Sequence, residues 1–108
     1  MVLELGCGDG FQLYLLRERF ARVFPIDPKH APADSAGFSF TVAEDLPFGD
    51  STFDLIVSNC VLEHLKDRPR GIKEAVRVLR LGGALELPPS AKKRKLRKTQ
   101  PTLLDLNP

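Results

Sequence analysis

Residues 2–10 of the chain read VLELGCGDG, a short apolar run that leads into three alternating glycines. The run from Val2 to Leu5 is typical of a buried strand. Glycines at positions 6, 8 and 10 allow a tight turn in which backbone N–H groups approach a ligand without Cβ atoms in the way. Apolar residues near one helical face then predict an amphipathic helix over about residues 10–20. This stretch therefore predicts a strand, a glycine loop and a helix, with a polar or anionic ligand at the loop.

The rest of the chain alternates between strand and helix patterns. Strands are predicted over residues 22–26, 38–42, 53–58 and 84–87, and the polar segment 29–37 is predicted to be a loop. A second helical region is predicted over residues 60–80, broken at Pro69, with Asp67 or Arg68 as its cap and Gly82 marking its end. The order predicts an α/β fold, an open and mostly parallel sheet of about five strands with helices on both faces.

The basic residues concentrate at the C-terminal end. Residues 91–108 hold six lysines and arginines and one aspartate, a net charge of +5, so the other 90 residues carry −3. We expect one small domain over residues 1–90 and a disordered tail over 91–108. Pro88 and Pro89 stop the last predicted strand, which would leave the sheet incomplete, with an open edge prone to self-association.

Composition excludes several classes of protein. No segment approaches the roughly 20 apolar residues of a membrane span, and the chain opens on a predicted strand without a basic or apolar leader. We therefore expect a cytoplasmic protein without membrane partners. Cys7 and Cys60, the two cysteines, are too few for a disulfide framework or a zinc site, so we expect no metal.

The spacing of the glycines limits which class of ligand the loop can bind. A dinucleotide-binding loop has the pattern G-x-G-x-x-G, and its third glycine would fall on Phe11. Taken alone, the loop is also consistent with a phosphate-binding site or a merely tight turn. Asp27, seventeen residues after Gly10, ends the second predicted strand, and an ionised carboxylate there is a good acceptor for a vicinal diol.

The acidic residue followed by G-x-G-x-G resembles the first motif of class I S-adenosylmethionine-dependent methyltransferases. The segments AEDLPF (43–48) and STFDLIVS (51–58) look like the "A-E-x-L-P-F … F-D-x-V-x-S" block of the type-11 methyltransferase domain. The segment EAVRVLRLGG (74–83) is similar to that group's "E-x-x-R-V-L-K-P-G-G" turn. These ordered motifs span about residues 2–87, so the chain is identified as a truncated member with a Rossmann-like fold.

The resemblance implies S-adenosyl-L-methionine as the cofactor. In the family the glycine loop packs against the methionine part, the acidic residue binds the ribose hydroxyls, and the segment before Leu-Pro-Phe lies along the adenine. Carried over to this chain, the cofactor-binding residues are expected to be Glu4, Gly6, Gly8, Gly10, Asp27, Ala43, Glu44 and Asn59. Val42 departs from the family, which has Asp there to bond the adenine amino group.

We therefore expect a transferase that methylates a small-molecule acceptor, since the enzyme mainly has to align the acceptor with the activated methyl group. His64 is a candidate proton acceptor, although a histidine on the polar side of a short helix is the simpler interpretation. Asn59-Cys60-Val61 lacks the Asn/Asp-Pro-Pro-aromatic signature of enzymes that methylate nucleic-acid amino groups. A nucleic-acid partner is therefore not expected. The basic run 92–95 could form a nuclear-localisation or nucleic-acid patch, but no aromatic residues lie among its basic residues, so a solvated segment is the favoured interpretation. The alternative is a non-catalytic, truncated module that binds the cofactor or a partner.

Overall fold

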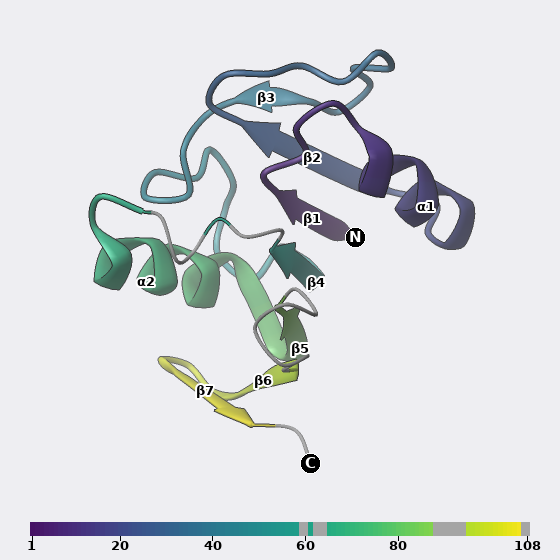
Figure 1. The fold of residues 1–108 in the computed structure, drawn as a ribbon. Coiled ribbons are helices and arrows are strands. Elements are labelled where there is room, and N and C mark those ends of the chain that lie inside the picture. The colour runs from purple at the N-terminus through teal and green to yellow at the C-terminus, as the bar shows by residue number, and fades with distance from the viewer. Residues whose placement is uncertain (59–60, 62–64, 88–94, 107–108) are drawn as a thin grey trace.

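The computed structural model of the chain describes residues 1–58, 61, 65–87 and 95–106. These residues form one sheet of seven strands in the order β3-β2-β1-β4-β5-β6-β7, with two helices (Figure 1). The elements are β1 (Val2–Leu5), α1 (Phe11–Arg19), β2 (Val23–Asp27), β3 (Ser39–Phe40), β4 (Phe53–Ser58), α2 (Arg68–Val78), β5 (Leu79–Glu86), β6 (Lys95–Gln100) and β7 (Leu103–Leu106).

Strand β1 lies in the middle of the parallel part of the sheet, between β2 and β4. All four of its residues are buried, as expected of a parallel strand covered on both faces. Its last residue, Leu5, is in register with Ile26 of β2 and Ser58 of β4. The carboxyl ends of the three strands therefore meet at one edge, where open parallel sheets bind ligands.

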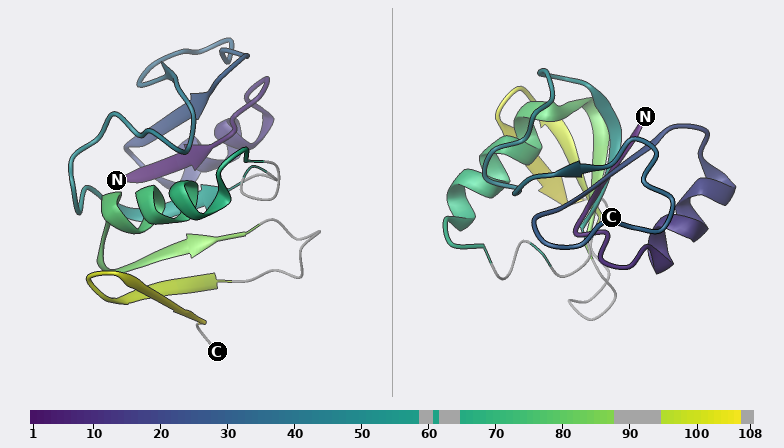
Figure 2. Two further views of the ribbon diagram at one scale, coloured as in Figure 1. Left: turned by 90° about the vertical axis from the view of Figure 1, so that its left-hand side faces the viewer. Right: turned by 90° about the horizontal axis from the view of Figure 1, so that it is seen from above.

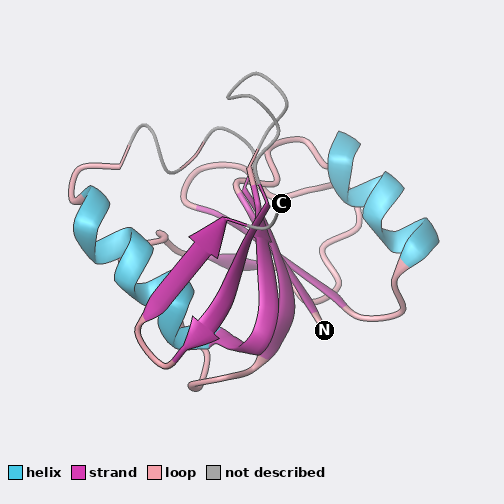
Figure 3. Cartoon of the chain, turned by 90° about the horizontal axis from the view of Figure 1, so that it is seen from below, coloured by secondary structure: helices cyan, strands magenta, loops and turns pink. Residues whose placement is uncertain are grey.

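The two helices cover opposite faces of the sheet (Figure 3). On one face, Leu13 and Leu16 of α1 pack against Val2, Val23 and Val57. On the other face, α2 contributes Ala75 and Val78 to a larger core cluster that includes Leu3, Leu5, Ile26, Phe53, Ile56 and Leu85. The predicted α/β class, the mostly parallel sheet and the coverage of both faces are confirmed.

The second helix is shorter than its sequence predicts. Residues 61 and 65–67 belong to the region predicted as helical from about residue 60, but they are not helical, and α2 begins at Arg68. The side chain of Asp67 accepts a hydrogen bond from the backbone N–H of Arg70 and Pro69 occupies the first turn, which confirms the predicted cap. The helix ends at Val78 rather than near Gly82, because Leu79 is extended and pairs with Phe53 of β4. Between β2 and β3 no helix forms, which confirms the predicted loop at 29–37.

The C-terminal segment differs from the prediction. Residues 95–100 and 103–106 form the antiparallel strands β6 and β7 rather than a disordered tail, and β6 pairs with β5 (Figure 2). The sheet thus has seven strands, not about five, and the edge of β5 that we expected to be open is covered. Residues 88–94, which include most of the basic run, lie outside the described residues.

Lys98 explains why a basic segment can join the sheet. Its side chain is buried, yet its Nζ donates hydrogen bonds to the carbonyl oxygens of Val76 and Leu79 at 2.8 and 2.7 Å. These carbonyls lie at the C-terminal end of α2, where a cation is favourable. The residue was predicted to lie in a disordered tail, but a lysine can bury its aliphatic stem when its ammonium group finds acceptors.

Candidate functional site at the carboxyl edge of the sheet

The glycine loop makes its turn with left-handed backbone conformations. Gly6, Gly8 and Gly10 have φ values of 78°, 54° and 97°. The backbone N–H groups of Gly6 and Cys7 both donate to the carbonyl oxygen of Ile26 in β2, at 2.9 and 3.0 Å. The loop is therefore fastened to the neighbouring strand, and α1 begins directly after it at Phe11.

The glycines differ in what surrounds them. A Cβ atom on Gly8 would meet no heavy atom within 4 Å, whereas one on Gly10 would lie 3.0 Å from Cβ of Pro32. Gly10 is thus packed against the loop that follows β2, while Gly8 faces open space. Gly8 is the place where a ligand can approach the backbone closely.

Asp27 lies against this loop, as its position at the end of β2 predicts. Its Oδ2 accepts a hydrogen bond from the backbone N–H of Gly8 at 3.0 Å. Its Oδ1 accepts from the backbone N–H groups of Lys29 and His30, at 2.8 and 2.9 Å. Burial alone would raise the pKa of this carboxyl group, but the donors from Lys29, His30 and Gly8 outweigh burial and lower the pKa. Asp27 is therefore an anion at neutral pH, in direct contact with the glycine loop.

Glu4 lies beneath the loop rather than on its surface. Its side chain is 0% exposed, and neither carboxyl oxygen has a hydrogen-bond partner among the residues described. Burial raises its pKa to about 7, with Arg17 lowering it and Asp27 raising it by smaller amounts. Its carboxyl group is close to the predicted site but is closed off from solvent.

Ala43 and Glu44 lie in the connection that follows β3. Ala43 is buried in the core cluster on the α2 side. The Glu44 carboxylate accepts a hydrogen bond from the backbone N–H of Asp67 at 3.4 Å, and its carbonyl oxygen accepts from Nε of Arg70 at 2.9 Å. The predicted adenine segment is thus attached to the start of α2.

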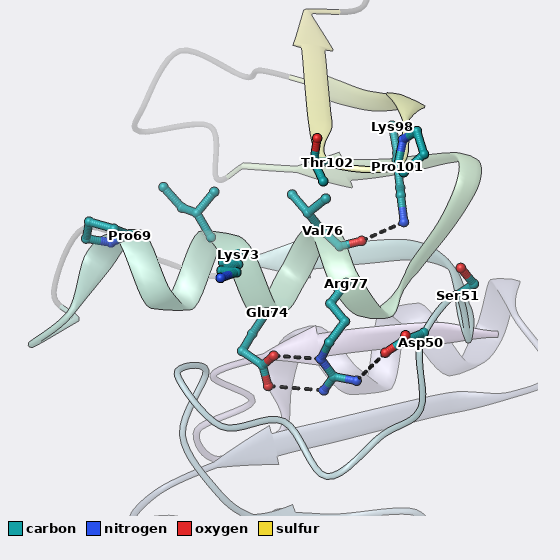
Figure 4. A pocket seen from close by; sticks show the side chains of 11 residues that line it. Asp50, Ser51, Pro69, Lys73, Glu74, Val76, Arg77, Lys98, Pro101 and Thr102 are labelled. Carbon is teal, nitrogen blue, oxygen red and sulfur yellow. Dashed lines mark hydrogen bonds and ion pairs between the residues drawn. The ribbon is translucent and has the colours of Figure 1, made fainter.

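Two residues with no role in the sequence prediction hold the next part of this connection. Glu74 and Arg77, three residues apart on α2, form a two-point ion pair: Arg77 Nε lies 2.6 Å from Glu74 Oε2 and Nη2 lies 3.1 Å from Oε1 (Figure 4). The guanidinium also donates to the carbonyl oxygens of Leu46 and Phe48, and Glu74 accepts from the N–H of Leu46. We call this arrangement the Glu74–Arg77 clamp. The signal in the sequence was the E-x-x-R spacing, because residues three apart share a helix face.

The clamp keeps both of its charges ionised. The hydrogen bond from Arg77 lowers the pKa of Glu74, against the effect of burial. In turn, Glu74 and Asp50 raise the pKa of Arg77. The segment 74–83 and the Leu-Pro-Phe turn therefore depend on one another. The helix supplies the charged side chains of Glu74 and Arg77, and the turn supplies the backbone groups that they bind.

The last predicted site residues can be placed only in part. Asn59 and the candidate proton acceptor His64 lie outside the described residues. Ser58, directly before them, is buried at the carboxyl end of β4, and its Oγ has no hydrogen-bond partner within the described part of the chain. The structure thus brings together the glycine loop, Glu4 and Asp27, and places Ala43 and Glu44 on the neighbouring connection.

Residues 3–87 match the model of a family described as "Methyltransferase domain". The match covers most of the chain, including the glycine loop, Asp27 and the Glu74–Arg77 clamp. The chain belongs to this methyltransferase family. S-adenosylmethionine is the cofactor that the family implies, which agrees with the prediction from the motifs.

Two relatives that are named as methyltransferases match 76% and 38% of this chain. A probable S-adenosylmethionine-dependent methyltransferase of Mycolicibacterium smegmatis is 33% identical over 89 residues, which is 76% of this chain and 35% of that protein. The chloroplastic 2-methyl-6-phytyl-1,4-hydroquinone methyltransferase 2 of Oryza sativa subsp. japonica is 63% identical over 41 residues, 38% of this chain and 12% of that protein. The domain therefore spans about a third or less of these relatives.

The fold is shared with solved structures. The YcgJ protein of Bacillus subtilis aligns with a TM-score of 0.72 and 26% identity, over 80% of this chain and 42% of that one. The Rossmann-like fold predicted from the motifs is confirmed by this likeness. In the part of this chain that is described, no helix is long and apolar enough to cross a membrane. Within the same residues, no three His, Cys, Asp or Glu side chains are grouped to hold a metal ion.

A separate cavity lies on the α2 face of the sheet. It has a volume of about 670 Å³ and lies between α2, the turn at Asp50 and Ser51, and the turn that joins β6 to β7 (Figure 4). None of the glycine-loop residues lines it. It is therefore distinct from the carboxyl edge where the motif residues gather.

Proposed function

We propose that this methyltransferase domain binds S-adenosylmethionine at the carboxyl edge of β1 and β2 and presents the methyl group to a small-molecule acceptor. The observation that supports this most directly is the contact between Gly8 N–H and Asp27 Oδ2 beside open space at Gly8. A Cβ-free backbone and an ionised acceptor thus lie side by side, as a ligand with a polar amino acid part and a ribose requires.

The residues present fit the cofactor, with one condition on Asp27. A carboxylate accepts about four hydrogen bonds, and three backbone donors already use this one. One ribose hydroxyl can therefore bind without rearrangement. A second hydroxyl requires one backbone N–H to give way, and we propose the donor from Gly8, the residue at which a Cβ atom would meet open space. In this proposal Ala43 and Glu44 lie along the adenine.

Methyl transfer requires of the protein mainly that it positions the cofactor and the acceptor. The bound cofactor supplies a methyl group on a positively charged sulfur, which is a good leaving group. The domain's task is to hold that sulfur and the acceptor in line. Gly6, Gly8, Gly10 and Asp27 would contact the methionine and ribose parts, while the buried Glu4 would act on them only indirectly. A proton acceptor such as His64 would assist where the acceptor must lose a proton.

A small molecule is the acceptor that we propose. The support is the 63% identity, over 41 residues, to a methyltransferase named for a phytyl hydroquinone. The segment after β4 also lacks the proline-rich signature of enzymes that methylate nucleic-acid amino groups.

Titration calorimetry with S-adenosylhomocysteine tests cofactor binding. The wild-type chain should bind, and Asp27→Asn should bind at least tenfold more weakly, because a hydrogen bond to a charged acceptor contributes about 1.5–3 kcal/mol. Glu18→Gln is the matched control, since it removes an exposed carboxylate from α1 and should leave affinity unchanged. A wild-type chain that is folded by circular dichroism but does not bind at millimolar ligand would disprove the proposal.

Transfer assays with labelled S-adenosylmethionine test the acceptor class. We expect methylation of one or more compounds in a panel of hydroquinones, phenols and amines, and none of DNA or RNA. Methylation of nucleic acid alone would contradict the small-molecule acceptor. Cofactor binding without transfer to any of these would favour the non-catalytic alternative.

A further inference from the structure

The carboxyl group of Glu4 is isolated from hydrogen-bond donors at the centre of the domain. It projects from the middle of β1, the central parallel strand, and is 0% exposed. Both of its oxygens lack a hydrogen-bond partner within the described residues. A buried carboxyl group without donors is stable only when it holds its proton, because burying the charged form costs far more.

The groups around Glu4 do not offset a negative charge there. Its register partners, Pro25 of β2 and Val57 of β4, are apolar. From α1, Arg17 exerts some attraction, but its guanidinium donates to the carbonyl oxygens of Asp34 and Ala36 and pairs with the Asp34 carboxylate.

The remaining neighbours disfavour a charge on Glu4 as well. Asp27 on β2 is an anion, which repels a second negative charge. The thiol of Cys7, in the loop above, keeps its proton because burial raises its pKa to about 11, and Glu4 and Asp27 add to that rise. Glu4 is therefore neutral without the cofactor at pH values below about 7.

Glu4 precedes the first glycine of the loop by two residues, and its carboxyl group is buried next to the place where the cofactor is proposed to bind. S-adenosylmethionine carries a sulfonium, an ammonium and a carboxylate, a net charge of +1. A positive charge over the loop would favour the ionised form of a carboxyl group beneath it, since charges interact strongly through a poorly solvated interior.

Building on the proposed function, we propose that Glu4 links cofactor binding to proton release: it holds a proton without the cofactor and gives that proton to solvent when the positively charged S-adenosylmethionine binds. The bound state then pairs a cationic ligand with a buried carboxylate. Affinity for S-adenosylmethionine accordingly rises with pH until Glu4 is ionised without ligand, and levels off above about pH 7.

The same link to proton release would make the affinities for the cofactor and for its product differ. When the methyl group moves, the bond from sulfur to methyl breaks, its electron pair stays on sulfur, and the acceptor forms the new bond to the methyl group and loses a proton. S-adenosylhomocysteine then has no sulfonium charge. Glu4 regains its proton more readily beneath this product, so the preference for cofactor over product increases as the pH rises toward about 7.

Calorimetry in buffers of different ionisation enthalpy measures the protons released. S-adenosylmethionine is titrated into the full chain at pH 7 in phosphate and in Tris, for the wild type and for Glu4→Gln. The wild type should release roughly half a proton more than Glu4→Gln, since a group with a pKa of about 7 is half protonated at that pH. The difference should be smaller when S-adenosylhomocysteine replaces S-adenosylmethionine. Glu18→Gln, which removes an exposed carboxylate from α1, should match the wild type.

The outcomes separate this inference from the proposed function. If neither ligand binds, the proposed function fails. If both bind, with equal proton release from the wild type and Glu4→Gln, the link through Glu4 is overturned while cofactor binding stands.

A measurement on the wild type covers the case in which Glu4→Gln does not fold. In protein labelled with ¹³C-glutamate, one carboxyl resonance should titrate near pH 7 and shift to a lower midpoint when S-adenosylmethionine is added. A midpoint that the cofactor leaves unchanged overturns the proposal.

Discussion

Glu4 and Asp27 lie on neighbouring strands below one loop, yet their acidities move in opposite directions. Both are buried, which by itself raises the pKa of a carboxyl group. Asp27 receives three backbone N–H donors and its pKa falls; Glu4 receives none from the described residues and its pKa rises to about 7. At the scale of single residues, the number of hydrogen-bond donors that reach each carboxyl group therefore decides which one is the anion.

This difference predicts a pH-dependent stability. The pKa of Glu4 is raised on folding, so its contribution is fully present below about pH 4.5 and is lost as the pH rises to about 7. Glu4→Gln removes this loss, and its free energy of unfolding should exceed that of the wild type by about 3 kcal/mol above pH 7, at roughly 1.4 kcal/mol per pKa unit. Urea unfolding between pH 5 and 8 measures the difference. A gap that does not widen with pH would contradict the assignment.

At the scale of elements, the Glu74–Arg77 clamp joins α2 to the connection that follows β3. One guanidinium binds two carboxylates and two backbone carbonyl oxygens, so a turn without regular secondary structure gains a defined position. Because Ala43 and Glu44 lie directly before this turn, the clamp also orients the proposed adenine segment.

Arg77→Ala should loosen this connection. It leaves Glu74 and the two carbonyl oxygens without their donor, and we expect a loss of about 2 kcal/mol in the free energy of unfolding. Hydrogen exchange at the Leu46 amide, which donates to Glu74, should become faster. Arg80→Ala is the control, because Arg80 and Asp54 form an exposed pair of the kind that contributes roughly 1 kcal/mol or less. Equal effects of the two variants would argue against the clamp.

At the scale of the whole molecule, the hairpin of β6 and β7 completes the sheet. It covers the edge of β5, and through Lys98 it also contacts the end of α2. This basic segment therefore contacts both a helix end and a sheet edge. Its charge pattern alone predicted neither contact.

Lys98→Met tests that connection. Methionine retains a similar apolar stem but cannot donate to Val76 and Leu79, so the variant should lose roughly 1–2 kcal/mol of stability. Lys95→Met on the same strand is the matched control and should change stability by about 0.5 kcal/mol or less, because Lys95 is half-exposed and lies 4.0 Å from Glu86. Thermal unfolding measures both. A Lys98→Met variant as stable as Lys95→Met would show that the buried ammonium group is not needed.

The sequence predicted best those features that depend on residues close together in the chain. The strand, the glycine loop and the first helix were predicted because alternating glycines after an apolar run leave few other conformations. The cap of α2 was predicted at Asp67 or Arg68 from the position of Pro69, and it lies at Asp67. The start of α2 was wrong by several residues, and its end was wrong by two, since Leu79 pairs with Phe53 instead of continuing the helix. The hairpin was missed because its pairing needs a partner strand distant in sequence.

By itself, the sequence determined the α/β order, the glycine loop and the placing of Asp27 beside it, because these depend on backbone freedom and on neighbours along the chain. Only the tertiary structure decided that Glu4 is sealed beneath the loop, that Arg77 holds a distant turn and that Lys98 is buried. The physical reason is the same in all three cases. Whether a charged side chain is solvated, paired or neutral depends on the groups that other segments bring to it, and folding alone assembles those groups.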